Sequence, residues 1–214
     1  KDGSIVDRWS WYKLPAFNNP KKNINKEQAI TGVAKYLRRA VHRQMVSDVP
    51  VGAFLSGGLD SSAIVAFAKE KDPDVRCFTI ETIGKQDKGT VDDLPYAKKV
   101  AKHLNVSLDV ISIDSSRMAN DLESMVVQLD EPLADPAALN VLYISQLAKE
   151  QGIKVLLSGA GGDDLFTGYR RHYALQLEHY WSWLPKGARI GLENFTKNFN
   201  VNNPIQRRLV KMFN

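Results

Sequence analysis

The stretch that decides the fold is VPVGAFLSGGLDSS, residues 49–62. Its first half, residues 49–55, is a short apolar run that ends at a glycine-rich loop, which is typical of a strand buried inside a parallel sheet. The loop SGGLDSS follows at residues 56–62, and the apolar spacing after it predicts a helix over about residues 61–71. A strand, a glycine-rich loop and a helix in this order place the loop at the carboxyl end of the strand.

The same alternation of short apolar runs and amphipathic segments continues through the chain. We predict further strands over 75–80, 107–113 and 153–157, and helices over 26–47, 94–104, 114–129 and 137–151. Asn25, Asp114 or Ser115, and Gly152 are the expected caps. This order predicts an α/β fold, an open parallel twisted sheet with helices on both faces. Ligands of such sheets bind beyond the carboxyl ends of the strands.

We divide the chain into three parts. Residues 1–25 are polar and interrupted by proline, and we interpret them as a lead-in arm or linker. Residues 26–171 carry the strand and helix pattern and form the predicted main domain. Residues 172–214 are helical and rich in aromatic residues, and we expect them to begin a helical subdomain that is cut short. Because the chain starts at Lys1, we interpret it as a fragment of a longer protein.

Composition narrows the class of protein. The 214 residues include 29 Lys and Arg against 24 Asp and Glu, so the net charge is +5, and the basic residues are spread along the chain. We therefore favour a solvated surface over a nucleic-acid groove. No apolar run is long enough for a membrane span. Because a single cysteine permits no intrachain disulfide, we expect a cytoplasmic protein. Cys77 is the single cysteine and lies in a predicted strand, which indicates a small buried residue.

The first loop combines groups that bind phosphate. Its two glycines allow close approach of the backbone to a ligand and positive φ angles. The hydroxyls of Ser56, Ser61 and Ser62 and the free N–H groups of the new helix converge on one spot, which suits an anion. Asp60 would repel a bare phosphate, so its presence predicts a Mg²⁺ ion that bridges the carboxylate to phosphate oxygens.

The second loop, SGAGGDD at residues 158–164, follows the last predicted strand. It superficially suggests a dinucleotide-binding fingerprint, but the last glycine of that pattern is missing. Both glycine-rich loops fall at carboxyl ends of strands, so we expect them to line one crevice.

The two loops together resemble the synthetase domain of the glutamine-dependent asparagine synthetase family. SGGLDSS is similar to the pyrophosphate-binding loop of the ATP pyrophosphatase superfamily, and SGAGGDD and the segment DEPLAD at 130–135 also resemble the asparagine synthetases. The resemblance implies a carbon–nitrogen ligase with glutamine as amido donor, in asparagine biosynthesis. ATP would adenylate a carboxylate with release of pyrophosphate, and ammonia would then displace AMP.

Residue roles follow from the resemblance at the matching positions. It implies that Asp60 and Asp163 are catalytic and share a Mg²⁺ site. The implied ATP-binding residues are Leu55, Ser56, Gly57, Gly58, Ser61, Ser62, Ile80, Ser158 and Gly159. Among these, Leu55 and Ile80 would flank the adenosine. The implied partners are a small-molecule carboxylate and ammonia from a glutaminase domain that is absent from this chain, with a homodimer left open.

Three alternatives remain open. A Glu often stands in asparagine synthetases where this chain has Ala160, so the acceptor is either aspartate or another carboxylate such as a sugar acid. A tRNA-modifying ATP pyrophosphatase and a non-catalytic nucleotide-binding module are the other two. Asp130, Glu131 and Asp135 would either contact the acceptor or form a turn fixed by proline, and for Arg170 and Arg171 we favour surface roles over steering ATP.

Overall fold

The computed structural model describes residues 3–12, 24–84, 92–131, 133, 135, 137–177, 183–196 and 199. The chain forms two compact units, Lys1–Ala40 and Val41–Asn214, which are considered separately. The described residues of the first unit up to Asn25 form neither helix nor strand, and helix α1 spans Lys26–Gln44. The predicted domain boundaries stay predictions.

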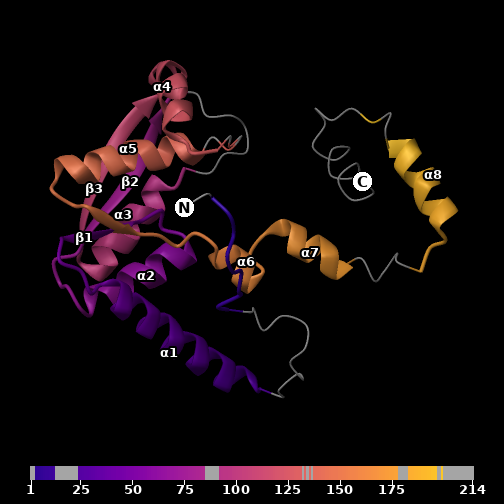
Figure 1. Cartoon of the computed structure of the whole chain (residues 1–214), viewed down its shortest axis with the longest axis horizontal. Helices are drawn as coiled ribbons and strands as arrows, with labels where there is room; N and C mark the ends of the chain where they lie inside the picture. The colour runs from indigo at the N-terminus through magenta and orange to yellow at the C-terminus, as the bar shows by residue number, and fades with distance from the viewer. Residues whose placement is uncertain are drawn as a thin grey trace. The chain divides into compact units, whose positions relative to one another are not determined.

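The second unit contains a four-stranded sheet in which every pairing is parallel (Figure 1). The strands are β1 (Val51–Phe54), β2 (Arg76–Ile83), β3 (Ser107–Asp114) and β4 (Val155–Leu157). Their order is β3-β2-β1-β4. Ala53 of β1 pairs with Cys77 of β2 on one side and with Leu157 of β4 on the other. The predicted parallel sheet is confirmed.

Helices connect the strands and follow the last one. They are α2 (Leu59–Lys69), α3 (Leu94–Leu104), α4 (Ser115–Gln128), α5 (Ala137–Glu150), α6 (Gly162–Phe166), α7 (Arg170–Leu177) and α8 (Lys186–Thr196). Asn25 caps α1, because its Oδ1 accepts a hydrogen bond from the Gln28 N–H at 2.8 Å. Asp114 caps α4 by accepting from the Arg117 N–H at 2.8 Å. Gly152, at φ +77°, ends α5. All three predicted caps are confirmed.

Alternate residues of the strands pack on opposite faces of the sheet, as the period of a strand requires. On one face Cys77 is buried with residues of α2 and α3, including Val65 and Ala101. On the other face Phe78 is buried against Ile144 of α5. A third cluster joins β3 to α4 and α5 through Ile113, Met125, Leu139 and Tyr143. Helices therefore cover both faces, as predicted.

Some boundaries differ from those expected from sequence. Strand β2 ends at Ile83 rather than at residue 80, because it pairs with β3 along its whole length up to Asp114. Helix α2 begins at Leu59 rather than at Ser61, so the last four residues of SGGLDSS form its first turn.

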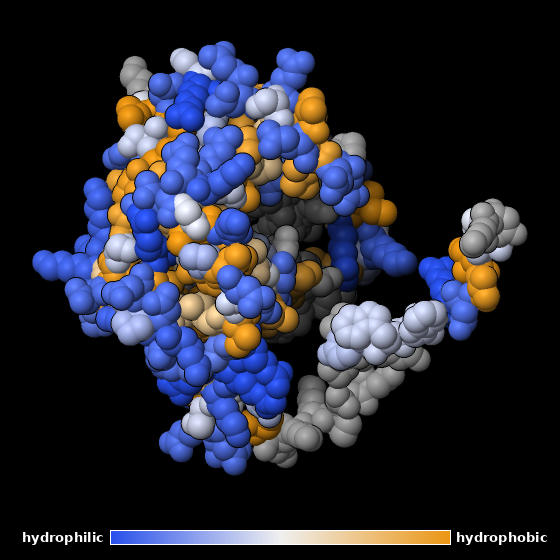
Figure 2. Space-filling view, turned by 60° about the vertical axis from the view of Figure 1, so that its left-hand side comes forward, coloured by the Kyte–Doolittle hydropathy of each residue, from blue (hydrophilic) through white to orange (hydrophobic). Residues whose placement is uncertain are grey.

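Among the described residues, no helix is long and apolar enough to cross a membrane. Figure 2 shows a face on which hydrophilic residues predominate and hydrophobic ones are interspersed.

Candidate functional site

The site lies where the order of the sheet changes direction. From β1 the chain proceeds to β2 on one side, whereas β4 joins the other side of β1. Because β1 and β4 are parallel neighbours, the loops that follow them leave the same edge of the sheet. Ligands of open α/β sheets bind at such a switch point. The two glycine-rich loops therefore meet where a ligand is expected.

A cleft of about 500 Å³ opens between these loops. Seven of the predicted site residues line this cleft, namely Ser56, Gly58, Asp60, Ser61, Ser158, Gly159 and Asp163. The other lining residues are Phe54, Leu59, Ala160, Gly162, Phe166 and Gly168. The expectation that both loops line one crevice is confirmed.

The amino end of α2 faces this cleft with its backbone donors. Gly58 is the N-cap residue, in an extended conformation, and no side chain of the described residues caps this end. The first N–H groups of a helix lack partners within it and carry partial positive charge. A phosphate at this position would receive hydrogen bonds from these groups.

The serine hydroxyls hold the loop together. The Oγ atoms of Ser56 and Ser61 lie 3.0 Å apart, within hydrogen-bond distance. The hydroxyl of Ser62 donates to the Gly58 carbonyl oxygen at 2.6 Å. The Gly58 N–H in turn donates to Ser56 Oγ at 3.3 Å. The loop is thus organised by its own hydrogen bonds before any ligand is bound.

Gly57 shows why the loop requires glycine. Its φ is +79°, a conformation that L side chains rarely adopt, and a Cβ atom here would collide with the backbone of Tyr96 and Ala97 at the start of α3. The loop between β1 and α2 therefore lies directly on α3.

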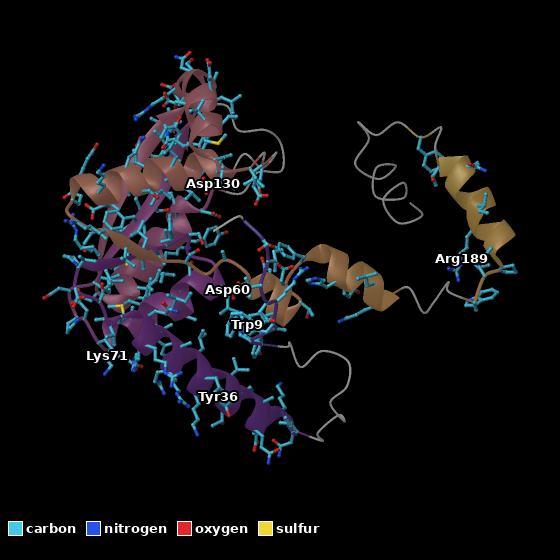
Figure 3. All side chains as sticks on the ribbon, viewed as in Figure 1. Trp9, Tyr36, Asp60, Lys71, Asp130 and Arg189 are labelled. Carbon is cyan, nitrogen blue, oxygen red and sulfur yellow. The ribbon has the colours of Figure 1, made fainter. Side chains whose placement is uncertain are left out.

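The second loop crosses the start of α2 just as closely. A Cβ atom on Gly159 would lie 3.0 Å from the Ser61 nitrogen and 3.1 Å from Asp60 Cβ. A Cβ atom on Gly162 would overlap the carboxylate of Asp60. The Asp60 carboxylate therefore lies against the first residue of α6 (Figure 3).

Asp163 brings a second carboxylate to the same cleft from α6. Carboxylate oxygens are the ligands that Mg²⁺ prefers, and Mg²⁺ usually takes one or two of them together with phosphate oxygens and water. The described residues hold no cluster of three or more His, Cys, Asp or Glu side chains for a metal. The chemistry of two carboxylates beside a helix end with free N–H groups fits a magnesium ion that would be held jointly by the protein and a phosphate ligand.

Four predicted site residues do not line the cleft. Gly57 lies against the start of α3, and the Ser62 hydroxyl donates to the Gly58 carbonyl oxygen within the first loop. Leu55 is only 1% exposed as a whole residue, packs in the core with Val65, and donates its N–H to the Phe78 carbonyl oxygen at 2.9 Å. Ile80 is half-buried and packs against the two clusters on the α5 face.

The structure adds lining residues that the sequence interpretation missed. Phe54 precedes the motif within β1, and Leu59 is an apolar residue inside the motif that is 86% exposed. An apolar residue in an otherwise polar loop was the available signal for Leu59. Gly162, Phe166 and Gly168 belong to GGDDLFTG, where the glycines on both sides of Asp163 were the signal.

The weaker candidates lie elsewhere. Asp130, Glu131 and Asp135 are exposed and do not line the cleft. The Oδ1 atom of Asp135 accepts from the Ala137 N–H at 2.9 Å, which favours the turn interpretation for that residue. The side chains of Arg170 and Arg171 lie outside the described residues.

Cys77 has no surface in contact with solvent. Burial, together with the charge of Asp109, raises the pKa of its thiol to about 12. The prediction that Cys77 is a small buried residue is confirmed, and a thiol with such a pKa is a poor nucleophile at neutral pH.

Comparison with known proteins identifies the family of the chain. The family model described as asparagine synthase matches residues 32–212. Asparagine synthetase [glutamine-hydrolyzing] 1 of Bacillus subtilis is 41% identical over 130 residues, which is 61% of this chain and 20% of the relative. A putative asparagine synthetase [glutamine-hydrolyzing] of Mycobacterium tuberculosis is 34% identical over 187 residues, 87% of this chain and 28% of the relative.

The chain also resembles solved structures at low sequence identity. The NH3-dependent NAD synthetase of Campylobacter jejuni matches with a TM-score of 0.41 and 12% identity, over 89% of this chain and 92% of the synthetase. The chain spans only a fifth to somewhat over a quarter of the two sequence relatives described above. The family match, by contrast, covers most of the chain and includes both loops of the cleft, and the chain therefore belongs to the asparagine synthase family.

Proposed function

We propose that this chain is the ATP-binding synthetase part of an ATP-dependent amidotransferase. The observation that carries the proposal is the cleft at the switch point of the sheet. There the uncapped amino end of α2 and the carboxylates of Asp60 and Asp163 face one space. Membership of the asparagine synthase family supports the same activity.

The first loop would bind the phosphates of ATP. The N–H groups at the start of α2 donate to the β- and γ-phosphate oxygens, and the hydroxyls of Ser56 and Ser61 line the same space. Asp60 and Asp163 would hold Mg²⁺, which supplies positive charge to the departing pyrophosphate. Both loops are fixed by close backbone contacts, so these groups need little rearrangement when charge develops on the leaving group.

The proposed reaction has two steps. An oxygen of the acceptor carboxylate attacks the α-phosphorus of ATP, the bond from that phosphorus to the oxygen bridging to the β-phosphate breaks, and pyrophosphate leaves. Ammonia then forms a bond to the acyl carbon, gives up a proton, and AMP leaves with the bonding electron pair. We propose that ammonia comes from glutamine in another part of the protein, because the two sequence relatives described above are named glutamine-hydrolyzing.

The acceptor is proposed to be aspartate, with another carboxylate such as a sugar acid as the alternative. Ala160 lines the cleft and has no group that takes up a proton. The proton released by ammonia must therefore pass to another acceptor. For this reason a carboxylate other than aspartate, such as a sugar acid, stays in the proposal as the alternative substrate.

Magnesium-dependent binding of ATP is the first test of the proposal. Calorimetric titration of the chain with ATP should show binding that requires Mg²⁺, and Asp60→Ala should abolish it because the variant lacks one of the two carboxylates. Asp130→Ala is the matched control, since this exposed carboxylate lies outside the cleft and its removal should leave the affinity unchanged. Binding that is equally strong without Mg²⁺, or in Asp60→Ala, would contradict the proposal.

The acceptor is tested in the complete protein that contains this chain. ATP–pyrophosphate exchange that depends on an added carboxylate would identify the acid, with aspartate and a uronic acid as the first two probes. Release of inorganic phosphate instead of pyrophosphate would contradict adenylation.

A further inference from the structure

The turn that follows α6 brings Gly168 back onto Asp163. Thr167 adopts a left-handed conformation with φ +58°, and the Gly168 N–H donates to the Asp163 carbonyl oxygen at 2.9 Å. The chain therefore reverses within five residues and ends with Gly168 beside the side chain of Asp163.

A side chain at residue 168 would occupy the place that the carboxylate of Asp163 takes in the structure, and the carboxylate would have to move. A Cβ atom there would overlap Oδ1 of Asp163, would lie 2.9 Å from its Cγ, and would lie 3.3 Å from its Cα. The φ of Gly168 is not in the left-handed region, so the backbone conformation itself does not require glycine. The space taken by the Asp163 carboxylate is what conflicts with a side chain.

Both residues line the cleft, which ties this contact to the proposed site. In the conformation in which Asp163 lines the cleft, its carboxylate lies beside the Cα of Gly168. The carboxylate of Asp60 lies against a glycine in the same way, because it contacts Gly162 at the other end of α6. The surroundings of a metal ligand matter because loss of a neighbour that orients the ligand typically lowers metal affinity by about 10- to 100-fold.

We propose that Gly168 is a positioning residue for Asp163: it keeps free the space in which the carboxylate of Asp163 must lie to share a magnesium ion with Asp60. This inference rests on the proposed function. Gly168 itself offers no side chain to the ligand, and its effect passes entirely through Asp163.

A cycle of four proteins tests the inference: the unsubstituted chain, Gly168→Ala, Asp163→Ala, and the double variant. The Mg²⁺ concentration that half-saturates ATP binding should rise by about 10- to 100-fold in Gly168→Ala, the range found when a partner of a metal ligand is removed. Asp163→Ala should abolish magnesium-dependent binding, as Asp60→Ala does, whether or not Gly168 is also replaced, so the coupling between the two positions is measured by the melting temperature.

The melting temperature gives a second readout. Gly168→Ala should lower it, and Asp163→Ala in the same chain should restore it, because the added methyl group then meets no carboxylate. The melting temperature of the double variant still tests the inference if Gly168→Ala alone fails to fold. A double variant that is as unstable as the single one would overturn the inference, since the backbone would then be what requires glycine.

Gly161→Ala, at the opposite end of α6, is the matched control. Its φ is +86°, and a Cβ atom there would meet nothing within 4 Å, so the change adds backbone strain without touching a carboxylate. It should lower the melting temperature and leave the half-saturating Mg²⁺ concentration unchanged.

The failure of this inference is distinguishable from the failure of the proposed function. If the unsubstituted chain shows no magnesium-dependent binding of ATP, the proposed function falls, and this role of Gly168 falls with it. If the unsubstituted chain binds and Gly168→Ala responds to Mg²⁺ in the same way, only the inference about Gly168 is overturned.

Discussion

At the scale of single residues, the adjacent glycines 57 and 58 should respond very differently to substitution. Gly57→Ala places a side chain in the left-handed region, at about 1–3 kcal/mol, and drives a methyl group into the backbone of α3. Gly58 has an ordinary φ, and its Cβ would lie 3.4 Å from Ser56 Oγ. Urea unfolding should show Gly57→Ala to be at least about 2 kcal/mol less stable than Gly58→Ala. Equal stabilities would mean that the loop moves off α3 at little cost.

At the scale of helices and strands, features that depend on neighbouring residues in the sequence were predicted correctly, whereas features that depend on distant segments were missed. Helix α3 was predicted with its observed bounds, because its apolar period is a local signal. The last residues of β2 were missed, because their pairing with β3 depends on a partner strand some thirty residues away. The site divides in the same way. Its motif residues were predicted, whereas Gly168 reaches Asp163 only through the left-handed turn at Thr167, a residue type that does not signal such a turn.

The cap of α4 gives a prediction at this scale. Asp114→Ala removes the acceptor of the Arg117 N–H and should lower the free energy of unfolding by about 1 kcal/mol. Asp114→Asn keeps an acceptor oxygen and should retain most of that stability. Urea unfolding compares both with Asn120→Ala, an exposed mid-helix change that should be neutral or slightly stabilising. Equal losses in the alanine and asparagine variants would show that charge, not the hydrogen bond, stabilises this end.

At the scale of the whole molecule, the cleft joins two parts of the chain that lie about a hundred residues apart in sequence. Its lining residues come from Phe54–Ser61 and from Ser158–Gly168, and unfolding would separate them.

A ligand that needs both loops binds the folded state alone. At a concentration of 100 times its Kd, such a ligand adds about 2.7 kcal/mol to the free energy of unfolding, which for a chain of this size is a rise in Tm of roughly 5–11 °C. Thermal melts with ATP and Mg²⁺ should show this rise. Pyrophosphate with Mg²⁺ should also raise Tm, because the proposed contacts of the polar loops are with the phosphates. A rise of equal size in Asp60→Ala, or one reproduced by sulfate at the same ionic strength, would place the binding outside the paired carboxylates.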